Sequence, residues 1–466
     1  MMKILVSFLF VFLSLTVQAN DIFKYTLEKH QKFEKTLSFD VDDNQTLHVL
    51  VVKNKDTKMY DFIPFRMNAQ QEVKEWTTIS FEEIPEIISY HTNGDTFTLL
   101  SLEDEHLDII DYSISEGTFS KDRWEDFTKP NNIFKQKGST VFLEEKENGA
   151  QIKITTIENA STVEKKEISV TEDLQRTLKK LLRSDSEIVD QEEYIEHGSI
   201  FEVQAYLEKG VFYFVENDND KEEEITLTQI NPLSNTITNT VITAPEVDKL
   251  RDNNTQIKDG KLFAIFQGKE DFSFNVYDAY TAENLKSFTL SEQLSQLTGI
   301  RSKKSNYLKE VEKLKNRPTV AINTSKSGNY IVSVNYVDQN TYNYNNFWFM
   351  HFMMQQQMMM MQPGGFGPHV ENFYPFYIAL PMEGSKPLTF VLSKELELLD
   401  NASEEAEKEF VDKKKYSEQL QENKNIYHPS LGFLKEEYHY MYSDKKEDVI
   451  YIKSKPIVKR ASSKRP

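Results

Sequence analysis

The chain of 466 residues contains no cysteine, so it has no thiol to lipidate, to oxidise to a disulfide or to use as a nucleophile. It also lacks long apolar runs. Only residues 4–17 form one, and it is shorter than the roughly 20 residues that a membrane-spanning helix needs. We therefore expect no transmembrane segment.

Motifs of hydrolytic catalysis are missing as well. The sequence has neither the Gly-x-Ser-x-Gly elbow of serine hydrolases nor the His-Glu-x-x-His motif of zinc proteases. Its 74 acidic residues could include a glycosidase pair, but such a pair is defined by distance in space and not by spacing along a chain.

The N-terminus has the pattern of a secretory signal. Met1, Met2 and Lys3 precede the apolar run, and Val17-Gln18-Ala19 then gives the small-residue pattern at which signal peptidase cleaves. We expect residues 1–19 to be a signal peptide that is cleaved after Ala19. Because extracellular animal proteins often carry disulfides, a cysteine-free exported chain favours a bacterial periplasm or cell exterior.

The charge is strongly acidic. The formal net charge is −19 at pH 7, so the chain repels phosphate backbones and we expect no nucleic-acid partner. Only the C-terminal end is basic, and residues 457–466 are expected to be a disordered tail.

Short strands recur along the mature chain at regular spacing. Alternating apolar residues and β-branched side chains mark segments such as 46–52, 96–102, 211–215 and 262–267. The recurring unit has four strands, and a tight polar turn joins the third strand to the fourth. In this turn an Asp or Asn side chain can accept a hydrogen bond from its own backbone two residues on.

The spacing between successive turns of this kind gives the length of the repeat. Tyr112 to Glu158 spans 46 residues and Asn231 to Asp278 spans 47, whereas Glu158 to Asn231 spans 73 because an insertion intervenes. Four strands in about 46 residues is the size of one β-propeller blade. Turns are expected at seven positions, near Asn68, Tyr112, Glu158, Asn231, Asp278, Met382 and Ser454.

The pattern resembles the bacterial propellers whose blades carry a Tyr-Asp…Thr-Gly turn, of the YVTN, quinoprotein-like and WD40-like kinds. The resemblance covers residues 20–456 and implies an all-β fold, a seven-bladed β-propeller of four-stranded antiparallel blades. The Gly-His and Trp-Asp dipeptides of WD40 blades and the tryptophan-docking motif of quinoprotein blades are absent, so the resemblance implies no activity. We also expect residues 21–27 to add the outer strand of the last blade.

Four insertions interrupt the repeat, at residues 171–187, 291–316, 341–370 and 394–424. The first is a predicted helix with Thr171 as its N-cap and with Leu174, Leu178, Leu181 and Leu182 on one side. We assign residues 341–370 to a turn between second and third strands, and the other three insertions to links between blades. In antiparallel blades all four then lie on one face, which predicts a binding surface there.

The insertion at residues 341–370 has an unusual composition, rich in methionine and aromatic residues. Exposed side chains of these kinds are adaptable and are rarely left in water without a partner. One interpretation is a tip that docks on another protein or a lipid surface. The residues that would carry it are Trp348, Phe349, Met350, Met353, Met354, Met358 and Phe366.

Two other interpretations of this insertion stay open. It can be a low-complexity loop that packs on its own propeller. It can also be a Cu(I) site of thioether ligands assisted by His351 or His369, although Met358 to Met361 are consecutive and dedicated copper sites usually space their ligands.

Other charged clusters favour ordinary surface roles. Neither the acidic residues of 218–224 nor those of 40–43 include the glycine that calcium loops use, so we interpret both as solvated hairpin tips. His91 before Gly94 and His197 before Gly198 are interpreted as one repeat feature at equivalent turns. His428, His439 and the pair Glu436-Glu437 are interpreted as surface groups.

These observations predict no metal and no cofactor, and they favour a non-enzymatic binding or scaffold protein with a protein partner in the cell envelope. The alternative is a hydrolase or lyase with its site in the propeller's central funnel, where polar side chains from several blades converge. A further alternative is a structural protein that acts only within an assembly.

Overall fold

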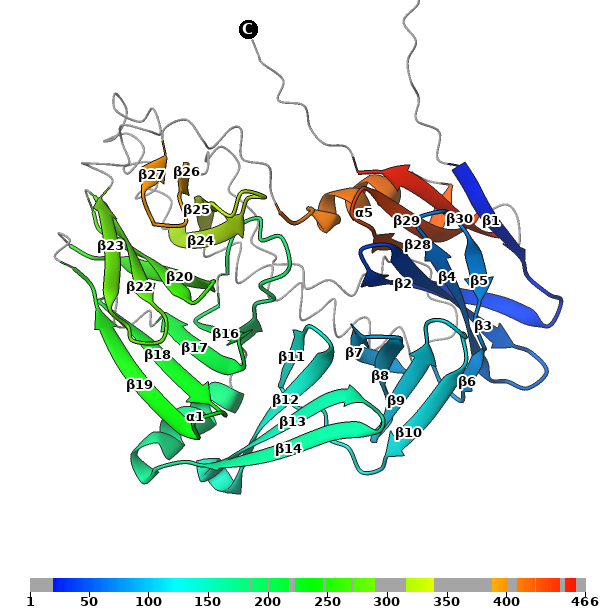
Figure 1. Ribbon diagram of the computed structural model, residues 1–466, viewed down its shortest axis with the longest axis horizontal. Coiled ribbons are helices and arrows are strands. Elements are labelled where there is room, and N and C mark those ends of the chain that lie inside the picture. Colours follow the sequence, from blue (N-terminus) through cyan, green and yellow to red (C-terminus); the bar gives the residue numbers. More distant parts are fainter. Residues whose placement is uncertain are drawn as a thin grey trace, which may run out of the picture. The chain divides into compact units, whose positions relative to one another are not determined.

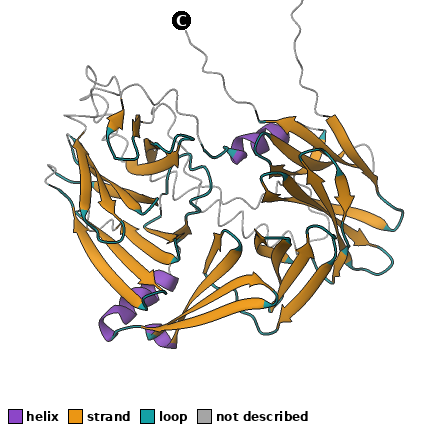
Figure 2. Cartoon of the chain, in the orientation of Figure 1, coloured by secondary structure: helices purple, strands orange, loops and turns teal. Residues whose placement is uncertain are grey.

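A computed structural model describes residues 20–183, 186–199, 201–217, 223–245, 249–269, 271–289, 316–338, 388–399, 409–423, 425–444 and 449–457. These residues form seven β-sheets with few helical segments, as Figure 2 shows. The pairing is antiparallel except in one sheet, where the two-residue strand Glu187–Ile188 pairs parallel with Val203–Glu208. The prediction of an all-β fold is confirmed. The predicted signal peptide, residues 1–19, lies outside the described residues.

The chain divides into two compact units. The terminal unit comprises Met1–Glu82, Pro368–Asn372 and Leu420–Lys459, and the central unit comprises Glu83–Gly367, Phe373–Gln419 and Arg460–Pro466. Each unit is described below by itself.

The terminal unit contains two sheets. One has the order β1-β30-β29-β28 and the other has the order β2-β3-β4-β5, with β6 also pairing with β4. Their strands are β1 (Asn20–Thr26), β2 (Gln31–Asp42), β3 (Gln45–Asn54), β4 (Tyr60–Asn68), β5 (Val73–Glu75), β6 (Ile79–Phe81), β28 (Ile426–Phe433), β29 (Glu437–Asp444) and β30 (Val449–Pro456).

The N-terminal strand completes the sheet formed by the C-terminal strands. β1 pairs antiparallel with β30, with Phe23 opposite Ile452. The ring of Phe23 lies 5.0 Å from the ring of Phe65, and the ring of Tyr25 lies 5.6 Å from that of Phe65. The predicted outer strand at residues 21–27 is therefore confirmed, and it covers an edge that β30 would otherwise expose.

The central unit contains five sheets, each built from consecutive strands, and Figure 1 follows them in chain order. Four of them are β7 (Glu86–Asn93) to β10 (Phe119–Trp124), β11 (Asn132–Gln136) to β14 (Thr162–Ser169), β20 (Asp252–Lys258) to β23 (Asn284–Thr289), and β24 (Asn316–Thr324) to β27 (Leu398–Leu399). The fifth has β15 (Glu187–Ile188), β16 (Val203–Glu208), β17 (Val211–Asn217), β18 (Glu224–Asn231) and β19 (Thr236–Thr243). The strands between their ends are β8 (Thr96–Glu103), β9 (His106–Ser113), β12 (Ser139–Lys146), β13 (Gln151–Asn159), β21 (Lys261–Gln267), β22 (Phe272–Asp278), β25 (Tyr330–Asp338) and β26 (Leu388–Leu392).

An inner strand of these sheets is buried on both faces. Along β21, Leu262, Ala264 and Phe266 pack in one apolar cluster with side chains of β17 and β18. The alternate residues Phe263 and Ile265 pack in another cluster with side chains of β25 and β26. Because side chains alternate between the faces of a strand, β21 is buried between two neighbouring sheets. This explains why its sequence reads as a continuous apolar run.

The predicted helical insertion is confirmed. α1 (Glu172–Arg183) follows β14, and its buried Leu178, Leu181 and Leu182 pack in a cluster with Phe134 and Phe214. The backbone carbonyl of Thr171 accepts a hydrogen bond from Leu174 N at 3.0 Å at the start of this helix.

The predicted insertion at residues 394–424 is partly wrong. It includes the two residues of β27, the last strand of its sheet, before α5 (Lys413–Gln421). The third strand of this sheet, β26, ends at Leu392, so the turn expected near Met382 comes later in the chain. Met382 itself lies outside the described residues. A repeat length cannot locate this turn, because the insertions on both sides of it differ in length from those of the other sheets.

The other two predicted insertions stay predictions. Along the chain, residues 341–370 come between β25 and β26, which pair with each other, and residues 291–316 come after β23 and end at Asn316, the first residue of β24. Apart from Asn316, both segments are outside the described residues, as are residues 458–466 of the predicted tail.

Candidate functional site

The seven residues predicted to form a docking tip, Trp348, Phe349, Met350, Met353, Met354, Met358 and Phe366, lie outside the described residues. Their role stays a prediction. The described residues offer three other candidates, namely apolar turns, an ion cluster and a histidine network.

The turns between third and fourth strands have the predicted geometry. Asn231 Oδ1 accepts hydrogen bonds from the backbone N–H groups of Leu233 and Ser234, at 3.0 and 3.3 Å. Asp278 Oδ1 accepts them from Tyr280 and Thr281, at 2.9 and 2.8 Å. Such bonds fix the turn backbone without help from other elements.

The second residue after each of these side chains projects into solvent. Leu233 is 82% exposed and Tyr280 is 58% exposed, and Leu285, just after the second turn, is 43% exposed. We call these three residues the turn patch. A single exposed apolar side chain is ordinary on a protein surface, but here two of them occupy the same position in the turns of successive sheets.

The two turns are also tied to each other. The side-chain amide of Gln229, on the strand that leads into the first turn, donates to the carbonyls of Ala279 and Tyr280 at 3.0 and 2.9 Å. The ammonium of Lys166, on β14, donates to the carbonyl of Pro232. Three successive sheets of the central unit are therefore joined at the turn patch.

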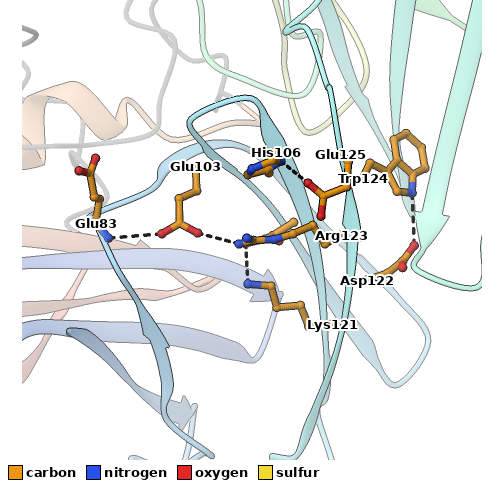
Figure 3. Close-up of polar contacts among 9 residues, drawn as sticks. Glu83, Glu103, His106, Lys121, Asp122, Arg123, Trp124 and Glu125 are labelled. Atoms are coloured by element: carbon orange, nitrogen blue, oxygen red, sulfur yellow. Dashed lines mark hydrogen bonds and ion pairs between the residues drawn. The ribbon is translucent and has the colours of Figure 1, made fainter. Parts of the chain in front are cut away.

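An ion cluster lies on β8, β9 and β10 (Figure 3). Asp108 is fully buried, and its two carboxylate oxygens accept hydrogen bonds from Arg123 at 2.6 and 2.8 Å. Lys121 Nζ lies 2.6 Å from Asp108 Oδ2, and Arg123 Nη2 donates to Glu103 at 2.6 Å. These hydrogen bonds raise the pKa of Arg123 above its ordinary value, so the cation is permanent.

This cluster stabilises its own sheet. Nε and Nη2 of Arg123 donate to the carboxylates of Asp108 and Glu103, so the charge of the guanidinium is already matched within the cluster. Fixing the outer strand β10 to β9 is the role that these bonds support.

The third candidate is a network of hydrogen bonds between the two sheets of the terminal unit. Ser38 Oγ lies 2.7 Å from His48 Nδ1, and Thr46 Oγ1 lies 3.0 Å from His48 Nε2. Thr46 Oγ1 is also 2.8 Å from His439 Nδ1, and His439 Nε2 is 3.3 Å from Glu437 Oε1. The chain of contacts thus runs from the sheet of β2 and β3 to the sheet of β28 to β30.

Both histidines of this network are fully buried. Burial lowers the pKa of His48 well below its ordinary value, and the neighbouring His439 lowers it further. Burial also lowers the pKa of His439, although the carboxylate of Glu437 opposes this. Both ring nitrogens of each histidine are engaged and no solvent reaches them, so the network joins sheets and does not meet a substrate.

The network corrects two interpretations from sequence. His439 is not a surface group, because its partner Thr46 approaches it across the adjoining sheet. His91 and His197 are not at equivalent turns: His91 lies within β7, whereas His197 precedes β16. His91 Nδ1 lies 3.0 Å from Thr140 Oγ1 of the next sheet, so it also joins sheets. Neither contact could be found from spacing, because the partners are distant along the chain.

A close approach of backbone accompanies the network. Gly432 of β28 pairs with His439, and a Cβ atom at Gly432 would lie 2.8 Å from Thr46 Cγ2. Only glycine therefore lets β28 come this close to Thr46.

The acidic residues at 40–43 cap a hairpin. Asp42 Oδ1 accepts from Asn44 N at 2.7 Å, and Asp40 Oδ1 accepts from Phe433 N at 2.6 Å. In the described ranges no three His, Asp or Glu side chains are grouped so that they could hold a metal ion. No helix in those ranges combines the length and apolar character needed to cross a membrane.

No known family model matches the chain, and no curated protein matches it. Among solved structures, a variant of the apocarotenoid oxygenase of Synechocystis is 10% identical, with a TM-score of 0.27; the match covers 57% of this chain and 63% of the oxygenase. A cobalt-substituted form of that enzyme gives the same values. An uncharacterised protein of Listeria monocytogenes is 11% identical over 68% of this chain and 78% of its own, with a TM-score of 0.25. Similarities this low assign neither a fold nor a function.

Proposed function

We propose that the protein is an exported seven-bladed β-propeller that acts as a binding or scaffold protein in a bacterial envelope. The proposal of a propeller is supported by consecutive strands in six of the seven described sheets, by inner strands such as β21 that are buried on both faces, and by a last sheet that the N-terminal strand completes. Propeller blades have these properties because no blade can bury both faces alone.

The turn patch is the observation that carries the binding function. Leu233 and Tyr280 are held outward by short turns whose backbones are fixed by Asn231 and Asp278. A rigid turn loses little conformational entropy when a partner covers it, so an exposed apolar side chain on such a turn is suited to binding. We expect a protein partner with an apolar surface to cover the patch.

The buried ionisable groups support binding over catalysis. Asp108 is neutralised by Arg123 and Lys121, and His48 and His439 use their ring nitrogens in contacts between sheets. These groups perform structural work in the fold and are not presented to a ligand.

The segment at residues 341–370 remains a second proposed docking element. Strand order puts it at a turn between second and third strands, which in an antiparallel sheet is the end opposite to the turns that carry the patch. Binding through the turn patch and binding through residues 341–370 can therefore be tested by separate variants.

Affinity capture from envelope extract tests the binding function. The baits are the mature protein, the double variant Leu233→Ser with Tyr280→Ser, and a deletion of residues 341–370. The variant Ser161→Ala is the matched control, since Ser161 occupies the same position after Asn159 in another turn of this kind. We expect a partner that the intact and control proteins retain and the patch variant loses.

Two other results would change the proposal. If only the deletion loses the partner, the binding site is the Met-rich segment and not the turn patch. If no folded bait retains any partner, the protein is not a binding module.

X-ray scattering at low concentration tests the propeller. A compact globule of this length has a radius of gyration of about 22 Å. A clearly larger value would mean that the two units are not closed into one ring.

A further inference from the structure

β19 is an outer strand without the usual protection against pairing with another chain. Its eight residues, Thr236 to Thr243, read TITNTVIT and include no charged residue, proline or glycine. It pairs with β18 in an uninterrupted register, and in the described ranges it pairs with no other strand. Figure 1 shows it at the margin of its sheet. Val241 is 52% exposed.

The strands at the corresponding edge of the other described sheets are protected, and β5, for example, has only three residues. β14 carries four consecutive charged residues, and β10 carries Lys121, Asp122 and Arg123. β23 has Lys286 and a bulge, β1 has Lys24 and a bulge, and β27 has only two residues. Charges, bulges and shortness are the devices that prevent edge-to-edge association, so β19 stands apart.

We propose that β19 is a homodimerisation edge, at which two copies of the chain pair antiparallel through this strand about a twofold axis. An extended edge of eight residues is about 26 Å long and offers unpaired backbone groups over that length. This inference does not depend on the proposed binding function.

The sequence of β19 suits pairing with itself. Directly opposed side chains of an antiparallel pair lie on the same face, so about a twofold axis odd residues face odd residues and even face even. A register centred on Asn239 places Ile237 of one copy opposite Val241 of the other, and Thr238 opposite Thr240. β-Branched pairs and Thr–Thr pairs are favourable across strands, and no register brings like charges together.

The second copy is a better occupant than a charged peptide because the edge offers no charge to recognise one. Pairing of two copies through this uncharged edge also predicts that the dimer becomes stronger as salt is added. Each copy has a formal net charge of −19, while the paired strands contribute none of it. Added salt screens the repulsion between copies, so it should strengthen the dimer, whereas a contact held by ion pairs would weaken.

Sedimentation of the mature protein at subunit concentrations from about 1 to about 100 μM tests the dimer, since weak specific contacts populate in this range. We expect a dimer whose dissociation constant falls as salt is added. Thr238→Lys places a cation on the exposed edge and should weaken the dimer about tenfold or more. Thr162→Lys makes the same change at an exposed position of β14 and should leave the dimer unchanged. Circular dichroism checks that both variants are folded.

The absence of cysteine gives an independent test. In the register centred on Asn239, the two copies of this residue are opposed with Cα atoms about 5 Å apart, which a disulfide can bridge. Asn239→Cys should form a disulfide-linked dimer on mild oxidation, and Thr162→Cys should not. A protein that stays monomeric at all concentrations, or cross-linking that is equal at the two positions, would overturn the proposal.

Discussion

At the scale of single residues, the terminal unit depends on histidines that are kept neutral. His48 and His439 are buried with lowered pKa values, and their hydroxyl partners Ser38 and Thr46 connect two sheets. A neutral imidazole can both donate and accept, and a protonated one can only donate, so protonation would break part of the network.

Acid should therefore destabilise the protein through His48. The unfolded-state pKa is near 6.5 and the folded-state pKa is lower, so below about pH 6.5 the unfolded chain binds more protons. The contribution of His48 to the free energy of unfolding should have its full value above this pH. It should fall as the pH is lowered towards the folded-state pKa of His48. Urea unfolding across this range should show a shallower pH dependence for His48→Gln than for the wild type. His30→Gln, at a partly exposed histidine, is the control; an equal pH dependence in all three proteins would refute the role of His48.

Glu187 should give stability the opposite dependence on pH. Burial raises the pKa of this β15 carboxyl to about 7 from 4.5, although the hydroxyl of Ser199 donates to it and partly offsets the shift. Between these two values the folded state holds the proton more strongly, so stability should fall as the pH rises. Glu187→Gln should gain in Tm relative to the wild type between about pH 5 and about pH 7.5. A constant difference in Tm would contradict this prediction.

The residue scale also shows which parts of the site a sequence can predict. The turns at Asn231 and Asp278 were predictable because each side chain bonds a backbone group two or three residues away. The network at His439 was not, because its hydrogen bond to Thr46 joins residues 393 positions apart. The exposure of Leu233 was also missed, since a turn motif does not say which neighbours cover it.

At the scale of elements, β1 and α1 were predictable from local pattern. α1 follows a capping residue and carries leucines on one side, and these leucines are buried as expected. The turn expected near Met382 lies later in the chain, after β26, because a strand of five residues next to a long insertion has no local signal that fixes its position. The repeat length alone does not fix this position either.

β1 should contribute measurably to stability although it is an outer strand. Phe23 is half-buried and packs on Phe65, so Phe23→Ala should lower the free energy of unfolding by about 2 kcal/mol. The neighbouring Lys24 is exposed, and Lys24→Ala should cost less than about 0.5 kcal/mol. Urea unfolding of the two variants measures the difference. Equal effects would mean that β1 does not pack as an integral strand.

At the scale of the whole molecule, the recurring strand and turn pattern predicts an all-β fold of repeated antiparallel sheets, and the described residues form seven sheets. The inner strand β21 is buried on both faces, and this is the property that makes a repeat of four strands depend on its neighbours. Function is less accessible from the sequence, since the turn patch depends on which apolar side chains the fold leaves uncovered.

Cross-linking in living cells tests most directly whether a partner binds the turn patch. Tyr280 is replaced by a photoreactive amino acid, and the same replacement is made at Ser161, which has the equivalent position after Asn159. We expect a cross-linked envelope protein from position 280 and none from position 161. Equal cross-linking at both positions, or none at either, would contradict it.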